Sequence, residues 1–208
     1  MDNCIFTAHC TEMCCDQSCP ILVETSYLLE RNGIQFSNPV FSKYSNSILD
    51  VVKFLDKYQH QTRRVLENDL GVKLNDAPTV QKADLITYCA ICKYWKGSQL
   101  HCTVYNLRYS KYLEEMKKSW TTGSESEILQ MMRIWSESCK VLIISNFDYV
   151  KFGDFESQTL LNLIQSRESQ ALTTILVGPS TIATAPNGLF TALLRKALHY
   201  PTGSTTKK

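Results

Sequence analysis

The strongest constraint on the fold of this chain is a short, continuously apolar segment, Val141 to Ile144, with a helical pattern on each side of it. A second apolar segment, Thr173 to Val177, follows the next helical pattern, and Leu100 to Leu107 alternates well enough for a strand. Strands that are apolar on both faces and are separated by helices are typical of a parallel sheet covered by helices on both sides. The sequence therefore predicts an α/β fold with a parallel sheet.

Helical periodicity predicts the segments between and before these strands. We expect helices over residues 21–35, 47–58, 82–94, 110–120, 124–135, 155–165 and 189–198. Residues 61–81 are polar and turn-rich, and only a short strand near 72–74 is expected there. We divide the chain into a small amino-terminal module, residues 1–40, and an α/β domain, residues 41–208.

Length, charge and hydropathy exclude several classes of protein. The 208 residues suffice for one domain and a small appendage, and the net charge of +2 leaves no bulk excess of basic residues for nucleic-acid binding. No apolar run approaches the roughly 18 residues of a bilayer span. The amino terminus, with Asp2 and no long apolar core, does not resemble a signal peptide. We expect a cytoplasmic protein that makes no contact with a membrane.

Five of the nine cysteines lie within the first 19 residues, which predicts a metal-binding module in a reducing compartment. The ligands expected for a closed Zn²⁺ site are Cys4, Cys10, Cys14 and Cys19, with Cys15 as an alternative to Cys14. An iron–sulfur cluster is the alternative cofactor, and free thiols are the interpretation without a metal. Cys89 and Cys92 fall within an apolar helical pattern, and we expect them to be core cysteines.

The order of segments from residue 82 to 198 resembles the helicase-loader family of AAA+ proteins, the DnaC/DnaI/IstB-like group of bacteria, phages and mobile elements. In that family a P-loop opens a helix, and an acidic strand, a sensor strand and an Arg-bearing helix follow. The matching segments are Lys82 to Leu85, His101 to Leu107, the helices of 110–135, Val141 to Asp148, Phe155 to Arg167, Thr173 to Leu176 and Leu193 to Arg195. The resemblance implies a P-loop (AAA+/RecA-like) core. Because few residues follow Arg195, we expect this core to lack a full helical lid. The resemblance also implies an amino-terminal zinc module that docks on a helicase.

The motifs that would bind and hydrolyse ATP are altered at the matching positions. The equivalent of the P-loop, Asp76 to Ala83, has no glycine, although Lys82 takes the position of the phosphate-binding lysine. Ala83 replaces the hydroxyl that binds Mg²⁺, and Ser145 and Asn146 replace the acids. Phosphoryl transfer depends on positioning and charge neutralisation, so these losses together predict a pseudo-ATPase and no ATP hydrolysis. Lys82 remains a degenerate nucleotide-binding candidate, and a solvated lysine at a helix start is the alternative.

We therefore expect a non-catalytic subunit of a DNA replication or mobile-element assembly, in a hetero-oligomer with a replicative helicase or an active AAA+ paralogue. The resemblance implies that Arg195 could act in a neighbour's nucleotide site; the alternative is that it only interacts with its own helix dipole. Single-stranded DNA is a further candidate partner, through Lys111, Lys117 and Lys118, unless these lysines are only solvated. Two other functions stay open. One is a nucleic-acid-binding regulator that uses the metal module, with the α/β domain as scaffold, and the other is an atypical but active ATPase.

Overall fold

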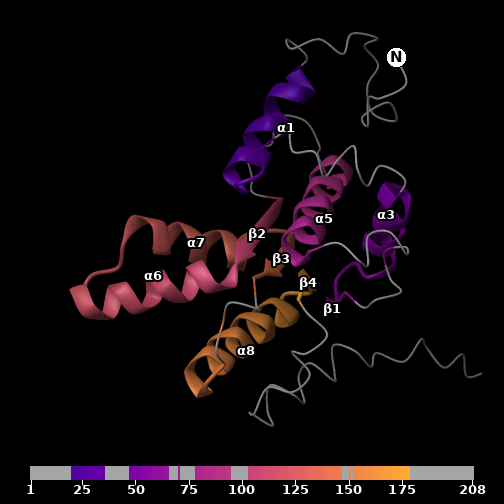
Figure 1. The fold of residues 1–208 in the computed structure, drawn as a ribbon. Helices are drawn as coiled ribbons and strands as arrows, with labels where there is room; N and C mark the ends of the chain where they lie inside the picture. Colours follow the sequence, from indigo (N-terminus) through magenta and orange to yellow (C-terminus); the bar gives the residue numbers. More distant parts are fainter. Residues whose placement is uncertain are drawn as a thin grey trace, which may run out of the picture.

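The computed structural model describes residues 20–35, 47–65, 70, 78–94, 103–146, 150 and 152–178 (Figure 1). These residues form α1 (Pro20–Arg31), α3 (Ile48–Lys57), β1 (Thr62–Arg64), α5 (Thr79–Tyr94), β2 (Val104–Arg108), α6 (Tyr109–Thr122), α7 (Glu127–Ser138), β3 (Val141–Ser145), α8 (Asp154–Ser169) and β4 (Thr173–Leu176). The predicted α/β class is confirmed. The expected strand near 72–74, the helix at 189–198, the lid and the cysteine module lie outside the described residues.

The four strands form one parallel sheet in the order β1-β4-β3-β2. The central strands β3 and β4 are buried over their whole length, which is why both read as continuous apolar segments. The edge strand β1 has the sequence Thr62-Arg63-Arg64 and lies where the sequence predicts only turns. Its three polar residues carry no apolar signal, so β1 forms through pairing with β4 and not through local propensity.

Helices cover both faces of the sheet (Figure 1). The helices α1, α3 and α5 lie on one face, where Leu85 of α5 and Ile143 of β3 belong to one hydrophobic core. The helices α6, α7 and α8 lie on the other face, where Leu142 of β3 packs in a second core with Leu160 of α8. Successive residues of β3 thus point to opposite layers, as the pleat of a strand requires.

Local signals fix several helix ends. The Ser126 hydroxyl accepts a hydrogen bond from the Leu129 N–H at 3.1 Å, so α7 begins within the Ser-Glu-rich segment that predicts a helix start. Gly123, with φ of 66°, ends α6 in the left-handed region that glycine tolerates. The Glu156 carboxylate accepts from the Gly153 N–H at 3.1 Å at the start of α8. Every helix among the described residues is too short or too polar to serve as a bilayer span.

Arg167, near the end of α8, is fully buried at the amino ends of the central strands. Its guanidinium donates to the carbonyls of Ser136 at 2.7 Å, Cys139 at 3.0 Å and Thr173 at 2.7 Å, and to the Thr174 hydroxyl at 2.9 Å. These bonds join α8, the end of α7, the start of β3 and the start of β4. A guanidinium suits this position because its donors form a rigid, planar fork.

The outer edge of β2 is covered by the turn that follows α1. The Asn32 amide donates to the Leu28 carbonyl at 2.7 Å and accepts from the Asn106 N–H at 2.6 Å. The next residue, Gly33, has φ of 70°, and a Cβ there would lie 3.3 Å from the Arg108 side chain. Arg108 instead lies across Gly33 and donates to its carbonyl at 3.2 Å. Two side chains, Asn32 and Arg108, and one glycine thus join the end of α1 to β2.

Candidate functional site at the carboxyl end of the sheet

The connections of the sheet place a topological switch point between β1 and β4. The connection from β1 to β2 runs through α5 on one face, whereas β2, β3 and β4 are joined through α6, α7 and α8 on the other. In open parallel sheets the ligand crevice lies outside the carboxyl ends of the strands at such a point. The segment from β1 to α5 has the strand–loop–helix order of a P-loop. Most of its loop lies outside the described residues.

The start of α5 differs from the expected helix start in a way that affects Lys82. The helix begins at Thr79, so Lys82 lies within its first turn, and its N–H donates to the Pro78 carbonyl at 3.1 Å. This N–H is therefore used inside the helix, whereas the anion-binding N–H groups of a helix are those left without an internal partner. Ala83 is buried. Lys82 is partly buried.

The carboxyl end of β3 carries neutral polar groups. Ser145 is buried, and its hydroxyl donates to the Asn106 side-chain carbonyl of β2 at 3.0 Å. Asn146 follows with φ of 61°, a left-handed conformation that asparagine tolerates better than most residues. Ser145 thus forms a hydrogen bond between neighbouring strands, and Asn146 forms the turn out of β3.

Two amide atoms at this end are buried without a hydrogen-bond partner in the described part of the chain, namely Asn106 Nδ2 and Asn146 Oδ1. The Asn106 side chain is only 5% exposed, and its other amide atom is occupied by Ser145. A buried polar atom without a partner costs about 1–3 kcal/mol, so native proteins keep few of them. Unpaired atoms of this kind indicate a place where a ligand, a partner or a water completes the site.

Asp84, in the second turn of α5, adds a buried carboxyl group to the same end. Burial raises the pKa of Asp84 to about 6, and the positive charge of Arg108 opposes that rise. Asp84 and Glu115 of α6 are the two carboxyl groups buried among the described residues. A carboxylate in the second turn of α5 places a negative charge close to the helix start, and this charge opposes the binding of an anion there. The described side chains at this end of the sheet therefore offer hydrogen-bonding groups and one carboxyl group. A Mg²⁺-dependent ATPase instead has acidic residues at the ends of its strands.

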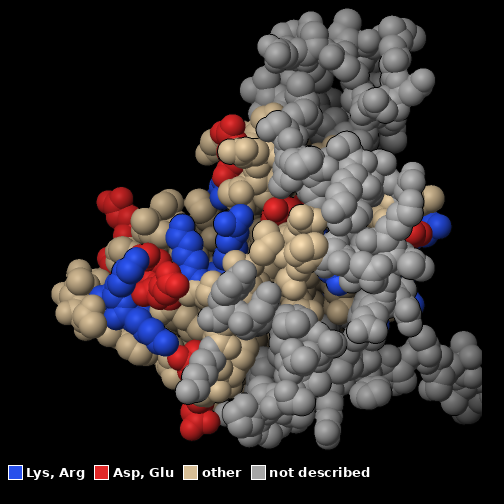
Figure 2. All heavy atoms as spheres, in the orientation of Figure 1, with Lys and Arg blue, Asp and Glu red and all other residues tan. Residues whose placement is uncertain are grey.

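The three lysines considered for nucleic-acid binding do not form one free basic patch. Lys117 pairs with Glu156 at 2.9 Å, and Lys118 pairs with Glu115 at 2.7 Å. Lys111, near the start of α6, lies at the rim of a groove between α1 and α7. Figure 2 shows blue and red side chains next to one another over the α6–α7 hairpin, which is the arrangement of a mixed, solvated surface.

The remaining candidates fall into two groups. Cys4, Cys10, Cys14, Cys15, Cys19 and Arg195 lie outside the described residues. In the part that the structure does describe, no three His, Cys, Asp or Glu side chains come together as a potential metal site. Cys89 is buried in the core, as predicted, and Cys92 is partly buried beside it. Burial raises the pKa of the Cys89 thiol to about 12, which suppresses the thiolate needed for metal or redox chemistry.

Sequence reasoning missed the residues that the structure brings together at this site: Asp84, Asn106 and Arg108. The sequence did carry a signal for Asn106, because asparagine is depleted in strands and Asn106 interrupts an otherwise strand-like segment. Asp84 likewise lies among apolar residues within α5. Comparison with protein-family models, with curated proteins and with solved structures finds no match to this chain.

Proposed function

We propose that the chain is a non-catalytic, AAA+-like pseudo-ATPase subunit of a cytoplasmic DNA replication or mobile-element assembly. In this proposal it binds a replicative helicase or an active AAA+ partner. The observation that carries the loss of catalysis is the 3.0 Å hydrogen bond between Ser145 and Asn106, at the end of the strand that would carry the acids. A neutral pair supplies no charge to hold Mg²⁺ or to activate water.

The start of α5 supports the same proposal. The Lys82 N–H is bonded within the helix, Ala83 offers no hydroxyl, and Asp84 adds a carboxyl group in the second turn of the same helix. Each change removes or opposes a different part of phosphoryl transfer, so restoring one of them would not restore the reaction. The strand–loop–helix arrangement supports kinship with P-loop proteins in fold, while its side chains favour a role without hydrolysis.

Calorimetric titration with ATP and Mg²⁺, followed by measurement of phosphate release, tests the loss of catalysis. We expect no binding at micromolar nucleotide and no turnover. Lys82→Ala is the matched control, because any activity that persists in this variant comes from a contaminant. Micromolar binding with turnover that Lys82→Ala abolishes would show that the chain is an atypical ATPase.

Reconstitution with an active AAA+ paralogue tests the partner role. The proposal assigns Arg195 to the neighbour's nucleotide site, where an arginine supplied by another subunit can raise hydrolysis by about 10³-fold or more. We expect the partner's hydrolysis to rise when the wild-type chain is added and to stay low with Arg195→Ala. An equal rise with both chains would remove Arg195 from the proposal and leave only binding.

The proposal includes an amino-terminal module that binds Zn²⁺ through Cys4, Cys10, Cys14 and Cys19. Elemental analysis of the purified chain should find about one zinc ion per chain and no iron. The double variant Cys4→Ser/Cys10→Ser should lose this metal. Iron together with inorganic sulfide would identify an iron–sulfur cluster instead.

A further inference from the structure

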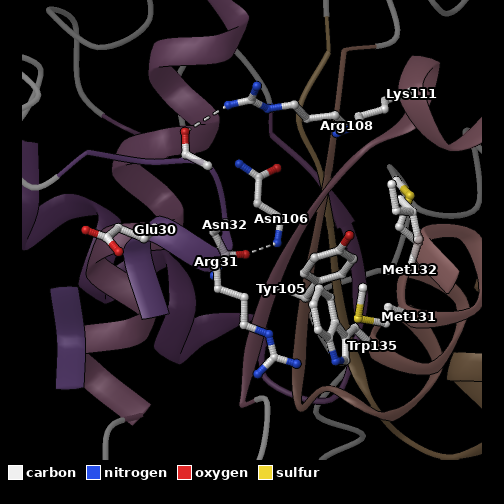
Figure 3. A pocket seen from close by; sticks show the side chains of 12 residues that line it. Glu30, Arg31, Asn32, Tyr105, Asn106, Arg108, Lys111, Met131, Met132 and Trp135 are labelled. Carbon is white, nitrogen blue, oxygen red and sulfur yellow. Dashed lines mark hydrogen bonds between the residues drawn. The ribbon is translucent and has the colours of Figure 1, made fainter. Parts of the chain in front are cut away.

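A groove with a volume of about 280 Å³ lies between the end of α1, the outer edge of β2 and the helix α7 (Figure 3). The groove is separate from the site at the end of β3, although Asn106 lines the groove and also accepts the hydrogen bond from Ser145. In Figure 3 the side chains of Met131, Met132 and Trp135 line one side, while Arg31 and Asn32 approach from the end of α1. The groove therefore joins three elements that are distant in the sequence.

The α7 side of the groove is apolar and exposed. Ile128 and Met131 line it and are 48% and 42% exposed, and Ile134, 53% exposed, continues the apolar surface along α7. Residues three apart lie on neighbouring positions of one helix face, so these three side chains form a continuous apolar strip. Methionine adapts its shape to different partners, which suits a protein-binding surface. An exposed apolar strip of this kind marks an interaction site more often than a random surface does.

The rim of the groove is basic, and two of its cations form no ion pair among the described residues. Arg31, Arg108 and Lys111 line the groove against a single acid, Glu30. The Arg31 guanidinium lies 3.7 Å from the centroid of the Trp135 ring, and its Nε is buried without a hydrogen-bond partner in the described part of the chain. The ion pairs found among the described residues use neither Arg31 nor Lys111. The exposed Lys111 ammonium is therefore available to a carboxylate from outside, and the Arg31 guanidinium adds a second positive charge at the same rim.

The strand side of the groove limits how a partner can bind. Asn106 Nδ2 is buried without a partner among the described residues, beside Arg108, which lies two residues along the same face of β2. The Asn106 N–H at the strand edge is already bonded to Asn32. A partner therefore cannot add as a further strand here without displacing the turn after α1, and a helix laid into the groove fits better.

We propose that this groove binds an amphipathic helix of a partner protein that has acidic residues beside its apolar face. The apolar face lies on Ile128 and Met131, and the acidic side chains pair with Arg31 and Lys111. This proposal extends the proposed function by giving the chemistry of a partner. It stands whether or not the chain has lost ATP hydrolysis, so the two proposals can fail separately.

Selection from a library of random, helix-length peptides on the full chain tests the proposal. We expect the enriched peptides to carry Asp or Glu together with apolar residues at helical spacing. For labelled copies of these peptides, fluorescence anisotropy should show Kd raised by at least about tenfold in Met131→Asp and in Lys111→Glu. The matched control is Leu49→Asp, because Leu49 is 61% exposed on α3, away from the groove, and this variant should bind like wild type.

Circular dichroism first establishes that each variant is folded, which is expected because the substituted side chains are exposed. Raising the salt concentration should weaken binding, since the contacts at the rim are between charges. Three results would overturn the proposal: enrichment of peptides without acidic residues, equal affinity for wild type and Met131→Asp, or no enrichment on wild type above that on Met131→Asp.

Discussion

At the amino ends of β3 and β4, the Arg167 guanidinium donates to three carbonyls and a hydroxyl, whereas at the carboxyl ends of β2 and β3 two buried amide atoms lack partners in the described chain. Both regions bury polar groups in the same sheet. At one end these groups join four elements. At the other end Asn106 and Asn146 are incompletely bonded, and burial raises the pKa of Asp84.

The two ends of the sheet differ in whether their buried polar groups have partners, and this difference suggests a structural role for one end and a binding role for the other. A buried polar network in which each donor has a partner stabilises one arrangement of the chain, while unpaired atoms cost free energy in the isolated molecule. Native proteins retain locally unfavourable features, such as unpaired buried atoms, mainly at functional sites. The Arg167 end is therefore expected to determine whether the chain folds, and the Asn106 end to determine what it binds.

The largest effect is expected for Arg167→Leu. The variant leaves the carbonyls of Ser136, Cys139 and Thr173 without their donor, and it should lower the free energy of unfolding by about 3–5 kcal/mol. Urea denaturation followed by circular dichroism measures this change. Arg167→Lys should be intermediate, because lysine keeps the charge but lacks the planar fork. A loss below about 1 kcal/mol in Arg167→Leu would show that this end does not hold the fold.

Asp84→Asn should stabilise the protein at pH 8 by about 2–3 kcal/mol and leave it unchanged at about pH 3, below both pKa values. Because the folded-state pKa of about 6 lies above the usual value, the folded protein binds the proton more tightly than the unfolded chain. Stability from this group is therefore present at low pH, is lost as pH rises from about 4 to about 6, and stays low above that. Urea midpoints across this range measure the effect.

The difference between the wild-type and Asp84→Asn profiles isolates this group. The pKa values of Glu115 and Glu156 are lowered, mainly by hydrogen bonds from Lys118 and Lys117, and these groups titrate equally in both proteins. Parallel profiles in the two proteins would show that Asp84 is not destabilising.

A smaller effect is expected at the pair formed by Asn106 and Ser145. Asn106→Leu alone should cost about 1 kcal/mol because it leaves the Ser145 hydroxyl without its acceptor. The double variant with Ser145→Ala should equal wild type or exceed it by up to about 1 kcal/mol, since it also removes the unpaired Nδ2. A double variant that loses more than about 2 kcal/mol would place this pair with Arg167 as a structural network.

The smallest effect is expected for Lys117→Ala. The pair with Glu156 lies at the surface, so its removal should cost less than about 1 kcal/mol, and the cost should vanish at high salt. Lys111→Ala is the matched control, because Lys111 has no ion pair among the described residues and should leave stability unchanged. An equal loss in both variants would point to helix propensity rather than to the ion pair.

The core of the fold could be predicted from the sequence because parallel strands buried on both faces must be apolar along their whole length. Val141 to Ile144 and Thr173 to Val177 satisfy this condition and form the two central strands. The strand β1 could not be predicted, because Thr62, Arg63 and Arg64 owe their conformation to the pairing with β4. Pairing with a distant strand leaves no periodic signal in three residues.

The candidate site could be predicted only at single positions. Alignment with the ATPase motifs identified Lys82, Ser145 and Asn146 as separate positions. It could not show that the Ser145 hydroxyl bonds to Asn106, 39 residues earlier in the chain, or that α5 begins early enough to use the Lys82 N–H. The groove was also beyond sequence reasoning, because α7 exposes an apolar strip while its overall pattern is that of an ordinary amphipathic helix.

The contact between Asn32 and β2 has a consequence for self-association. An uncovered edge strand presents a row of main-chain donors and acceptors to which another chain can add, and such edges initiate aggregation. Here a single amide satisfies the Asn106 N–H while its other end holds the last turn of α1. Loss of the Asn32 side chain would remove the acceptor of the Asn106 N–H, while Leu29 and Ile34 would still pack α1 and the turn after it into the core. One substitution would therefore open a main-chain donor of the β2 edge to another chain.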